Sequence, residues 1–373
     1  MAARLRIAFF GSSLLSAYWN GAATYYRGLI RALHERGHCI TFYEPEAFER
    51  QKHCDMPAPA YAYSVIYPAH EAGVRAALAS AREADVVVKA SGVGVFDTLL
   101  EHEVLGLQSA RTRVVFWDVD APATLDRVRQ HADDPFRQCI PEYDLILTYG
   151  GGAPVVQAYL ALGARVCVPI YNALDPETHH PVAPDARFSA SLGFLGNRLP
   201  DREARVHTFF FEPARALPGC RFLLGGSGWE QYVPQLPNVT YLGHVYTSDH
   251  NAFNCTPLAV LNVNRESMAR YGFSPPTRIF EAAGAAACLI TDAWDGLELF
   301  LEPGRECLVA RNGVEVVNHL HSLTPERARR LGQAARRRVL AGHTYAHRAA
   351  QVDELLYATR ETLQGVTHEY AVS

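Results

Sequence analysis

The chain has 373 residues, enough for two domains with large cores, and its composition of 49% hydrophobic and 20% charged residues is that of a globular protein. A formal net charge of −4 gives the protein no overall electrostatic attraction to nucleic acid. No apolar run approaches the roughly 20 residues of a membrane span. The eight cysteines form no C-x-x-C pair, which favours reduced thiols and a cytoplasmic protein.

The first half of the chain alternates short buried strands with amphipathic helices. The predicted strands are Leu5–Phe10, Cys39–Tyr43, Asp85–Lys89, Val114–Trp117, Leu145–Thr148 and Ala164–Pro169. Helices are predicted at Ala22–Gly37, which stops at a glycine, and at Ala69–Ala84. This β-α-β rhythm indicates a parallel, doubly wound sheet.

Clustered prolines between Pro169 and Pro184 interrupt this rhythm and predict a linker. A second alternation follows. Its predicted strands are Ser191–Leu195, Arg221–Leu224, Val239–Leu242, Ala259–Asn262, Cys288–Thr291 and Cys307–Ala310. Helices Pro325–Leu340 and Tyr345–Leu363 close the chain. We therefore predict an α/β fold of two doubly wound, Rossmann-like domains facing a cleft, with ligands outside the carboxyl ends of the strands.

The segment Pro275–Asp292 combines the parts of a site for a nucleotide diphosphate. Pro276 pre-sets a helix start, and Thr277 is the expected cap. Arg278 beside the open helix N-terminus predicts an anion site. Glu281 lies on the same helix face, where its carboxylate is suited to hold ribose hydroxyls.

Polar loops follow other strands of the second half. Arg198 and Arg202 suit a diphosphate, because guanidinium groups match phosphate oxygens; a salt bridge within Asp201–Arg205 is the alternative. Further ligand candidates at this edge are Gly226, Ser227 and Asn264. The arginines of the helix Pro325–Leu340 indicate a solvated face, with a peripheral contact to acidic lipid as the alternative.

In the first half, the loop with Gly11, Ser12, Asn20 and Gly21 follows the first strand and opens a helix. Its small residues allow a ligand close to the backbone, and a tight structural turn is the alternative. There is no G-x-G-x-x-G, which disfavours a dinucleotide site. Lys89 ends another strand, either facing an anion or extending its amine to solvent.

Asp118 and Asp120 are the predicted catalytic pair. Two carboxylates two residues apart at a strand end project to one side, where they can act as a base or orient hydroxyls. Asp118, the first after the strand, is the preferred base. Capping of a helix at Thr124–Gln130 is the alternative, and is more natural for Asp120. No metal site is predicted from the sixteen histidines.

Together these motifs resemble GT-B glycosyltransferases, and the Pro275–Asp292 segment especially resembles the CgeB-like group. The resemblance covers most of the chain and is firmest over Leu192–Arg348. The matching blocks are Gly11–Ser13, Asn20–Leu33, Phe194–Arg198, Leu224–Trp229, Tyr241–Val245 and Arg278–Glu281.

The resemblance implies a metal-independent glycosyltransferase whose co-substrate is a nucleotide-diphosphate sugar, with no other cofactor. Residues 1–175, completed by a C-terminal helix at about 345–373, would bind the acceptor, and residues 176–344 the donor. Glu281 would bind the ribose. The base would be flanked by His244, Val245 and Tyr246, and the phosphates held by Arg198, Arg202 and the helix start at Thr277. No nucleic-acid partner is indicated.

One residue departs from the family pattern. Retaining relatives carry a glutamate eight positions before the second one, and here that position is Phe273. This leaves the stereochemical outcome open. It also keeps two alternatives: a nucleotide-sugar-binding regulatory protein, and a sugar-nucleotide epimerase on the same fold.

Overall fold

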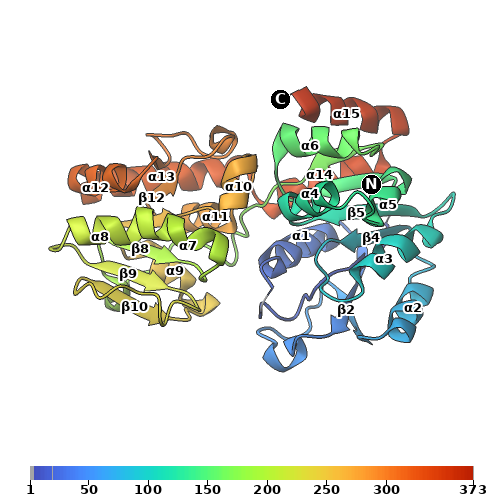
Figure 1. Ribbon diagram of the computed structural model, residues 1–373, viewed down its shortest axis with the longest axis horizontal. Coiled ribbons are helices and arrows are strands. Elements are labelled where there is room, and N and C mark those ends of the chain that lie inside the picture. The colour runs from blue at the N-terminus through green and yellow to red at the C-terminus, as the bar shows by residue number, and fades with distance from the viewer. Residues whose placement is uncertain (1–3, 19, 373) are drawn as a thin grey trace. The chain divides into compact units, whose positions relative to one another are not determined.

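The computed structural model describes residues 4–18 and 20–372. The chain divides into two compact units, each built on one parallel β-sheet (Figure 1). Unit 1 is Met1–Tyr171 with Tyr345–Ser373, and unit 2 is Asn172–Thr344. The predicted fold class, two doubly wound α/β sheets, is confirmed.

The sheet of unit 1 has seven strands in the order β3-β2-β1-β4-β5-β6-β7, all paired in parallel. The strands are β1 (Arg6–Phe10), β2 (Cys39–Glu46), β3 (Tyr63–Pro68), β4 (Val86–Ala90), β5 (Arg113–Asp118), β6 (Leu145–Thr148) and β7 (Cys167–Pro169). The direction of winding reverses between β1 and β4, and ligands of such sheets bind outside the strand ends at this point.

The sheet of unit 2 has six strands and the same winding, β10-β9-β8-β11-β12-β13. The strands are β8 (Leu192–Leu195), β9 (Phe222–Gly225), β10 (Val239–Gly243), β11 (Ala259–Asn262), β12 (Leu289–Asp292) and β13 (Leu308–Ala310). Every residue of β8, β9, β11 and β12 is buried. Both faces of this sheet are therefore covered, as in other parallel sheets, and the reversal falls between β8 and β11.

Helices fill the crossovers of both sheets. Those of unit 1 are α1 (Ala23–Glu35), α2 (Glu71–Ser80), α3 (Asp97–Glu103), α4 (Ala121–Gln130), α5 (Phe136–Cys139), α6 (Gly152–Ala161), α14 (Tyr345–Tyr357) and α15 (Arg360–Val372). Those of unit 2 are α7 (Pro200–Val206), α8 (Glu212–Ala216), α9 (Thr247–Cys255), α10 (Glu266–Tyr271), α11 (Thr277–Gly284), α12 (Gly313–Ser322) and α13 (Pro325–Gly342). Among the helices that the structure describes, none is long and apolar enough to cross a membrane.

The end of the chain differs from the single helix predicted over Tyr345–Leu363. Helix α14 stops at Tyr357, and α15 starts again after Thr359, whose hydroxyl accepts a hydrogen bond from the Thr362 amide. Arg113 donates to the carbonyls of Leu355 and Ala358 and satisfies the end of α14. Both helices belong to unit 1, where α14 packs on α1 and α15 on α6 (Figure 1).

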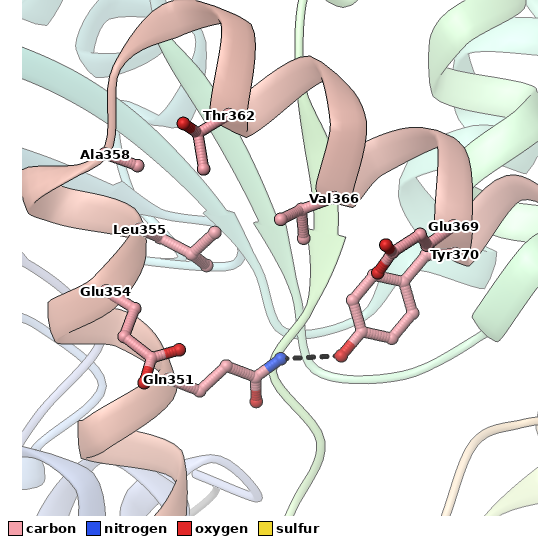
Figure 2. A pocket seen from close by; sticks show the side chains of 8 residues that line it. All are labelled: Gln351, Glu354, Leu355, Ala358, Thr362, Val366, Glu369 and Tyr370. Atoms are coloured by element: carbon pink, nitrogen blue, oxygen red, sulfur yellow. Dashed lines mark hydrogen bonds between the residues drawn. The ribbon is translucent and has the colours of Figure 1, made fainter.

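A cavity of about 460 Å³ lies between α14 and α15 (Figure 2). Leu355 and Val366 contribute apolar side chains, and Gln351 donates to the Tyr370 hydroxyl across it at 2.9 Å. None of the residues that the sequence predicts for the site lines this cavity.

Candidate functional site

A tight backbone contact joins three strand-end loops of unit 2. Gly226 has φ +119°, and a Cβ there would lie 2.3 Å from the Gly196 carbonyl oxygen, so this position requires glycine. Its amide donates to the Gly243 carbonyl at 2.8 Å. The amide of Ser227 donates to Asn197 Oδ1 at 2.9 Å. The loops after β8, β9 and β10 thus form one rigid edge beside the strand ends.

Helix α11 begins at this edge without a side-chain cap. Its N-cap residue is Pro276, and Thr277 is the first helical residue, so the prediction of Thr277 as the cap is wrong. Proline has no side-chain acceptor, and the amides of the first turn are left for another partner. Arg278 lies on that turn. The helix start therefore presents backbone donors and a cation together, which suits an anion.

Three arginines gather near this helix start. Burial and the neighbouring charge of Arg265 lower the pKa of Arg202 to about 10; Arg278 contributes in the same direction. Arg202 Nε is buried and has no hydrogen-bond partner in the described parts of the chain. Arg265 is paired with Asp201 at 2.8 Å. A bound diphosphate would relieve this repulsion and fill the vacant donor.

Arg198 has partners of its own within unit 2. Its guanidinium lies 3.3 Å from the centre of the Tyr232 ring and pairs with Glu203. The Arg198 amide donates to the Ser227 carbonyl at 2.9 Å. The sequence predicted both arginines as phosphate ligands, and Arg198 Nε, like Arg202 Nε, is buried without a hydrogen-bond partner among the described residues.

Glu281 is buried beside one arginine and two histidines. Arg278 Nη1 lies 2.9 Å from its Oε2, an ion pair without hydrogen-bond geometry, and His179 Nε2 lies 3.8 Å from its Oε1. Burial alone would raise the pKa of Glu281, but Arg278, His179 and His250 together lower it to about 2. The carboxylate is charged at neutral pH. Within residues 4–18 and 20–372, its Oε2 has no hydrogen-bond partner, so an acceptor is available for a ligand hydroxyl.

His179 and His250 are site residues that the sequence did not indicate. Their rings stack 6.2 Å apart, and each has a buried Nδ1 without a hydrogen-bond partner among the described residues. His250 Nε2 contacts the Val245 carbonyl at 3.2 Å. His179 comes from the proline-rich segment predicted as a linker, and His250 from α9. Only folding brings them to Glu281, so no local spacing pointed to them.

The histidine cluster predicts a dependence of stability on pH. Burial lowers the pKa of His250 from 6.5 to about 4, so the unfolded chain takes up a proton below about pH 6.5 while the folded one does not. The contribution of the neutral His250 to the free energy of unfolding is therefore fully present above pH 6.5 and is lost as the pH falls toward 4. Replacing His250 with Asn should reduce this fall by about 2 kcal/mol between pH 7 and pH 5. Urea unfolding at pH 7 and pH 5 measures it.

The control for this experiment is His321→Asn, which changes an exposed histidine of α12 in the same unit. If the free energy of unfolding falls equally with pH in the wild type and the His250→Asn protein, burial of His250 is not the cause of the pH dependence.

Asn264 lies buried at the switch point of unit 2. The backbone N–H of Asn264 donates to the Asp292 carboxylate at 3.1 Å, and the side-chain Oδ1 of Asn264 accepts from Asn262 Nδ2. Asp292 is itself paired with Arg205 at 2.6 Å. The Nδ2 of Asn264 is buried without a hydrogen-bond partner in the part of the chain that the structure describes. Asn264 thus keeps one donor for a ligand at the edge where Arg265 also lies.

The three residues after β10 differ in exposure. His244 is exposed and Tyr246 is 69% exposed, with their rings edge to face at 4.7 Å. Val245 is buried with Leu195 and Phe253. His244 and Tyr246 have the accessibility that contact with a nucleotide base needs, whereas the Val245 side chain belongs to the core.

In unit 1, the loop after β1 uses its polar side chains within itself. Ser12 Oγ donates to Asn20 Oδ1 at 2.8 Å, and Asn20 Nδ2 donates to the carbonyls of Ser13 and Ser16. Gly11 is buried against Phe42, where a Cβ would lie 2.5 Å from the ring. These bonds fix the loop shape. Gly21, by contrast, is exposed, with nothing within 4 Å of an added Cβ, so a ligand can approach its backbone.

Lys89 is fully buried at the end of β4. Its Nζ lies 2.5 Å from Asp97 Oδ1, and the Phe116 ring is 5.9 Å away. The amine therefore balances a carboxylate within unit 1. Neither sequence interpretation, an anion ligand or a solvent-reaching lysine, describes this position.

Asp118 and Asp120 lie after β5 in different surroundings. Asp118 is completely buried and accepts hydrogen bonds from Ser91 Oγ at 2.7 Å and the Tyr159 hydroxyl at 2.5 Å. It also accepts from the Asp120 amide and Thr124 Oγ1, both at 3.0 Å. Burial raises the pKa of Asp118. Asp120 is only half-buried, and its side chain does not cap α4. Asp118 thus anchors the start of α4, and Asp120 is the more accessible carboxylate.

In the described residues no group of three or more His, Cys, Asp and Glu side chains is arranged to hold a metal ion. No metal ligand set can therefore be assigned from these residues.

A family model matches part of the sequence, and solved structures match the fold. The glycosyl transferase-like family matches residues 202–354, as the resemblance to the CgeB-like group predicts. No curated protein sequence matches the chain.

Solved structures match nearly the whole chain at low identity. A sucrose-phosphate synthase from Thermosynechococcus elongatus has 16% identity and a TM-score of 0.67, covering 94% of this chain and 98% of its own. HepE of Anabaena, solved with UDP and glucose, has 14% identity and a TM-score of 0.65, covering 95% and 99%. An alpha-glucosyltransferase solved with UDP-glucose and DNA has 11% identity and a TM-score of 0.69, covering 95% and 100%. The chain thus shares the GT-B fold of these structures, and residues 202–354 match the glycosyl transferase-like family.

Proposed function

We propose that the protein transfers a sugar from a UDP-sugar bound by unit 2 to an acceptor bound by unit 1, without a metal ion. The observation that carries this proposal is the gathering of Arg202, Arg265 and Arg278 at the uncapped start of α11. Three guanidinium groups and backbone amides can neutralise a leaving diphosphate. The choice of uracil follows the nucleotides bound in the similar structures, UDP and UDP-glucose.

Each group then has a chemical role in the transfer. The arginines stabilise the charge that develops on the diphosphate as the glycosidic bond breaks. The charged Glu281 accepts hydrogen bonds from the ribose hydroxyls, and the neighbouring Arg278 keeps it ionised. Asp120 orients the acceptor hydroxyl or takes its proton. Asp118 positions Asp120 through the Asp120 amide.

Phe273 supports a second candidate, a nucleotide-sugar-binding protein without transfer activity. Its backbone has φ +47°, which is uncommon for a bulky residue, and its amide donates to the Asp295 carbonyl at 2.6 Å. An aromatic ring cannot replace the glutamate of retaining relatives in hydrogen bonding. An epimerase of the same fold would also bind the donor, but it would release no nucleotide.

A thermal-shift series with nucleoside diphosphates tests the donor assignment. Because a ligand that binds only the folded state raises its stability, UDP at about 100 times its Kd should add roughly 2.7 kcal/mol. Absence of a shift with every nucleoside diphosphate would contradict a nucleotide site.

Transfer should persist in excess chelator. The arginines and the α11 amides supply the positive charge that a divalent cation would otherwise bring to the diphosphate. Release of UDP from UDP-glucose, measured with and without EDTA, checks this. Activity lost in EDTA and restored by magnesium or manganese would assign a metal to Asp120.

We also propose a cytoplasmic location, in line with the free thiols of all eight cysteines. Free thiols are typical of a reducing compartment.

A further inference from the structure

The sheet of unit 1 has an uncovered edge at β3. This strand pairs with β2 on one side, and no strand of the described residues pairs with its other side. Of its six residues, Tyr67 alone is buried, whereas Tyr63 is 72% and Ile66 44% exposed. Successive side chains of a strand point to opposite faces, so Tyr63 and Ile66 flank the edge on both faces of the sheet.

The opposite edge of the same sheet, at β7, is covered by side chains. The Thr367 hydroxyl of α15 accepts a hydrogen bond from the Cys167 amide at 3.3 Å, and Gln351 of α14 donates to the Pro169 carbonyl at 3.2 Å. These two side chains take the place of a further strand. Within residues 4–18 and 20–372, no side chain makes such a bond to the backbone of β3. The outer side of β3 therefore presents backbone donors and acceptors to solvent.

The segment around β3 also lacks the features that protect a free edge. From Met56 to Ala69 the sequence contains no Asp, Glu, Lys, Arg or His. The strand pairs with β2 in one unbroken register, without a bulge, and Pro68 is its last residue. Charged side chains, bulges and prolines within a strand are the usual means of preventing an edge from pairing with another chain. An edge without them is suited to bind a further strand.

We propose that β3 is a dimerisation edge, which pairs in antiparallel orientation with β3 of a second copy of the chain and joins two seven-stranded sheets. A two-fold axis brings identical edges together in opposite directions, so a second copy supplies a strand of matching length. Because the segment is uncharged, the two copies place no like charges opposite each other. The exposed Tyr63 and Ile66 would be covered by apolar side chains of the other copy.

This dimer should be weak and reversible, because a contact of one short strand from each copy is small for a protein interface. Sedimentation velocity of the full chain between about 2 and about 200 μM should show the average mass rising from that of one chain toward that of two. Hydrogen exchange of the β3 amides should be slower at the higher concentration, because the second copy pairs them. The proposal depends on neither the donor nor the acceptor of the transfer reaction.

Two variants place a lysine in the edge, Tyr63→Lys and Ile66→Lys. Each should raise the dissociation constant of the dimer at least about tenfold, since lysine at an edge strand blocks pairing. Both side chains are exposed, so the substitutions remove little buried contact. The matched control is Val314→Lys, which adds the same charge at an apolar residue of α12 that is 68% exposed.

Dimers that form with rising concentration, slow the exchange of β3 and are weakened by both β3 variants but not by Val314→Lys support the proposal. A wild type that stays monomeric over this range overturns it and leaves the edge to a strand of another protein. Dimers without slower β3 exchange, or dimers that form equally in the folded β3 variants, overturn it as well, because another surface then joins the copies. The exchange measurement uses the wild type alone, so it decides the question even if the variants misfold.

Discussion

The Asp120→Asn protein should turn over roughly 100-fold more slowly than the wild type, the usual scale for losing a general base, while its affinity for UDP stays the same. The substitution keeps the size of the side chain and removes its charge. Asp120 is half-buried after β5 and does not cap α4, so its carboxylate is accessible to an acceptor. Sugar transfer and calorimetric UDP binding measure the two quantities.

Asp118→Asn should behave differently, although the sequence made Asp118 the preferred base. An amide group in place of one carboxylate oxygen would face the Tyr159, Ser91 or Thr124 hydroxyl. This mismatch should lower the free energy of unfolding by about 1–3 kcal/mol. Asp133→Asn, an exposed change beyond α4, is the control for both variants. Wild-type turnover in the Asp120→Asn protein would remove Asp120 from the reaction.

Replacing Arg278 with Ala should weaken UDP binding by more than about 1.5 kcal/mol, roughly tenfold, because a charge-assisted bond to phosphate is lost. The matched control is Arg187→Ala, which removes an exposed arginine of unit 2 that pairs with Asp185 and Asp249. Calorimetry with UDP distinguishes the two proteins.

Arg278→Ala also leaves the buried Glu281 without its nearest cation, so the variant can lose stability. Arg202→Gln is therefore a second variant, since the Arg202 guanidinium lies near Arg278 and does not depend on Glu281. A folded Arg278→Ala protein and an Arg202→Gln protein that both bind UDP normally would contradict the diphosphate site.

The buried strands could be predicted because each is a short apolar run between loops. Leu145–Thr148 and Ala259–Asn262 agree with the structure residue for residue. Strand β3 was missed, because it lies at the sheet edge and most of its residues, such as Tyr63, are at least partly exposed. Without a buried face, its sequence has no clear strand period.

The placement of candidate residues could be predicted from the sequence where it depends only on the ends of strands. The positions of Arg278, Glu281 and Asn264 follow from the loops after β11 and the helix before β12, and the structure brings them to one edge of unit 2. Burial could not be predicted in the same way. Asp118 and Asp120 are equivalent in sequence, and only the packing of Tyr159 and Ser91 encloses the first of them.

Release of UDP from UDP-glucose is the most direct test of the central claim, that unit 2 holds a sugar donor for transfer. The account predicts that the wild type and Arg187→Ala release UDP in excess EDTA, and that folded Arg278→Ala releases it at least about tenfold more slowly when the donor is limiting. Isomerised donor without free UDP would instead identify an epimerase. Tight binding of UDP-glucose with neither release nor isomerisation, whatever acceptor is offered, would contradict transfer and leave a nucleotide-sugar-binding protein.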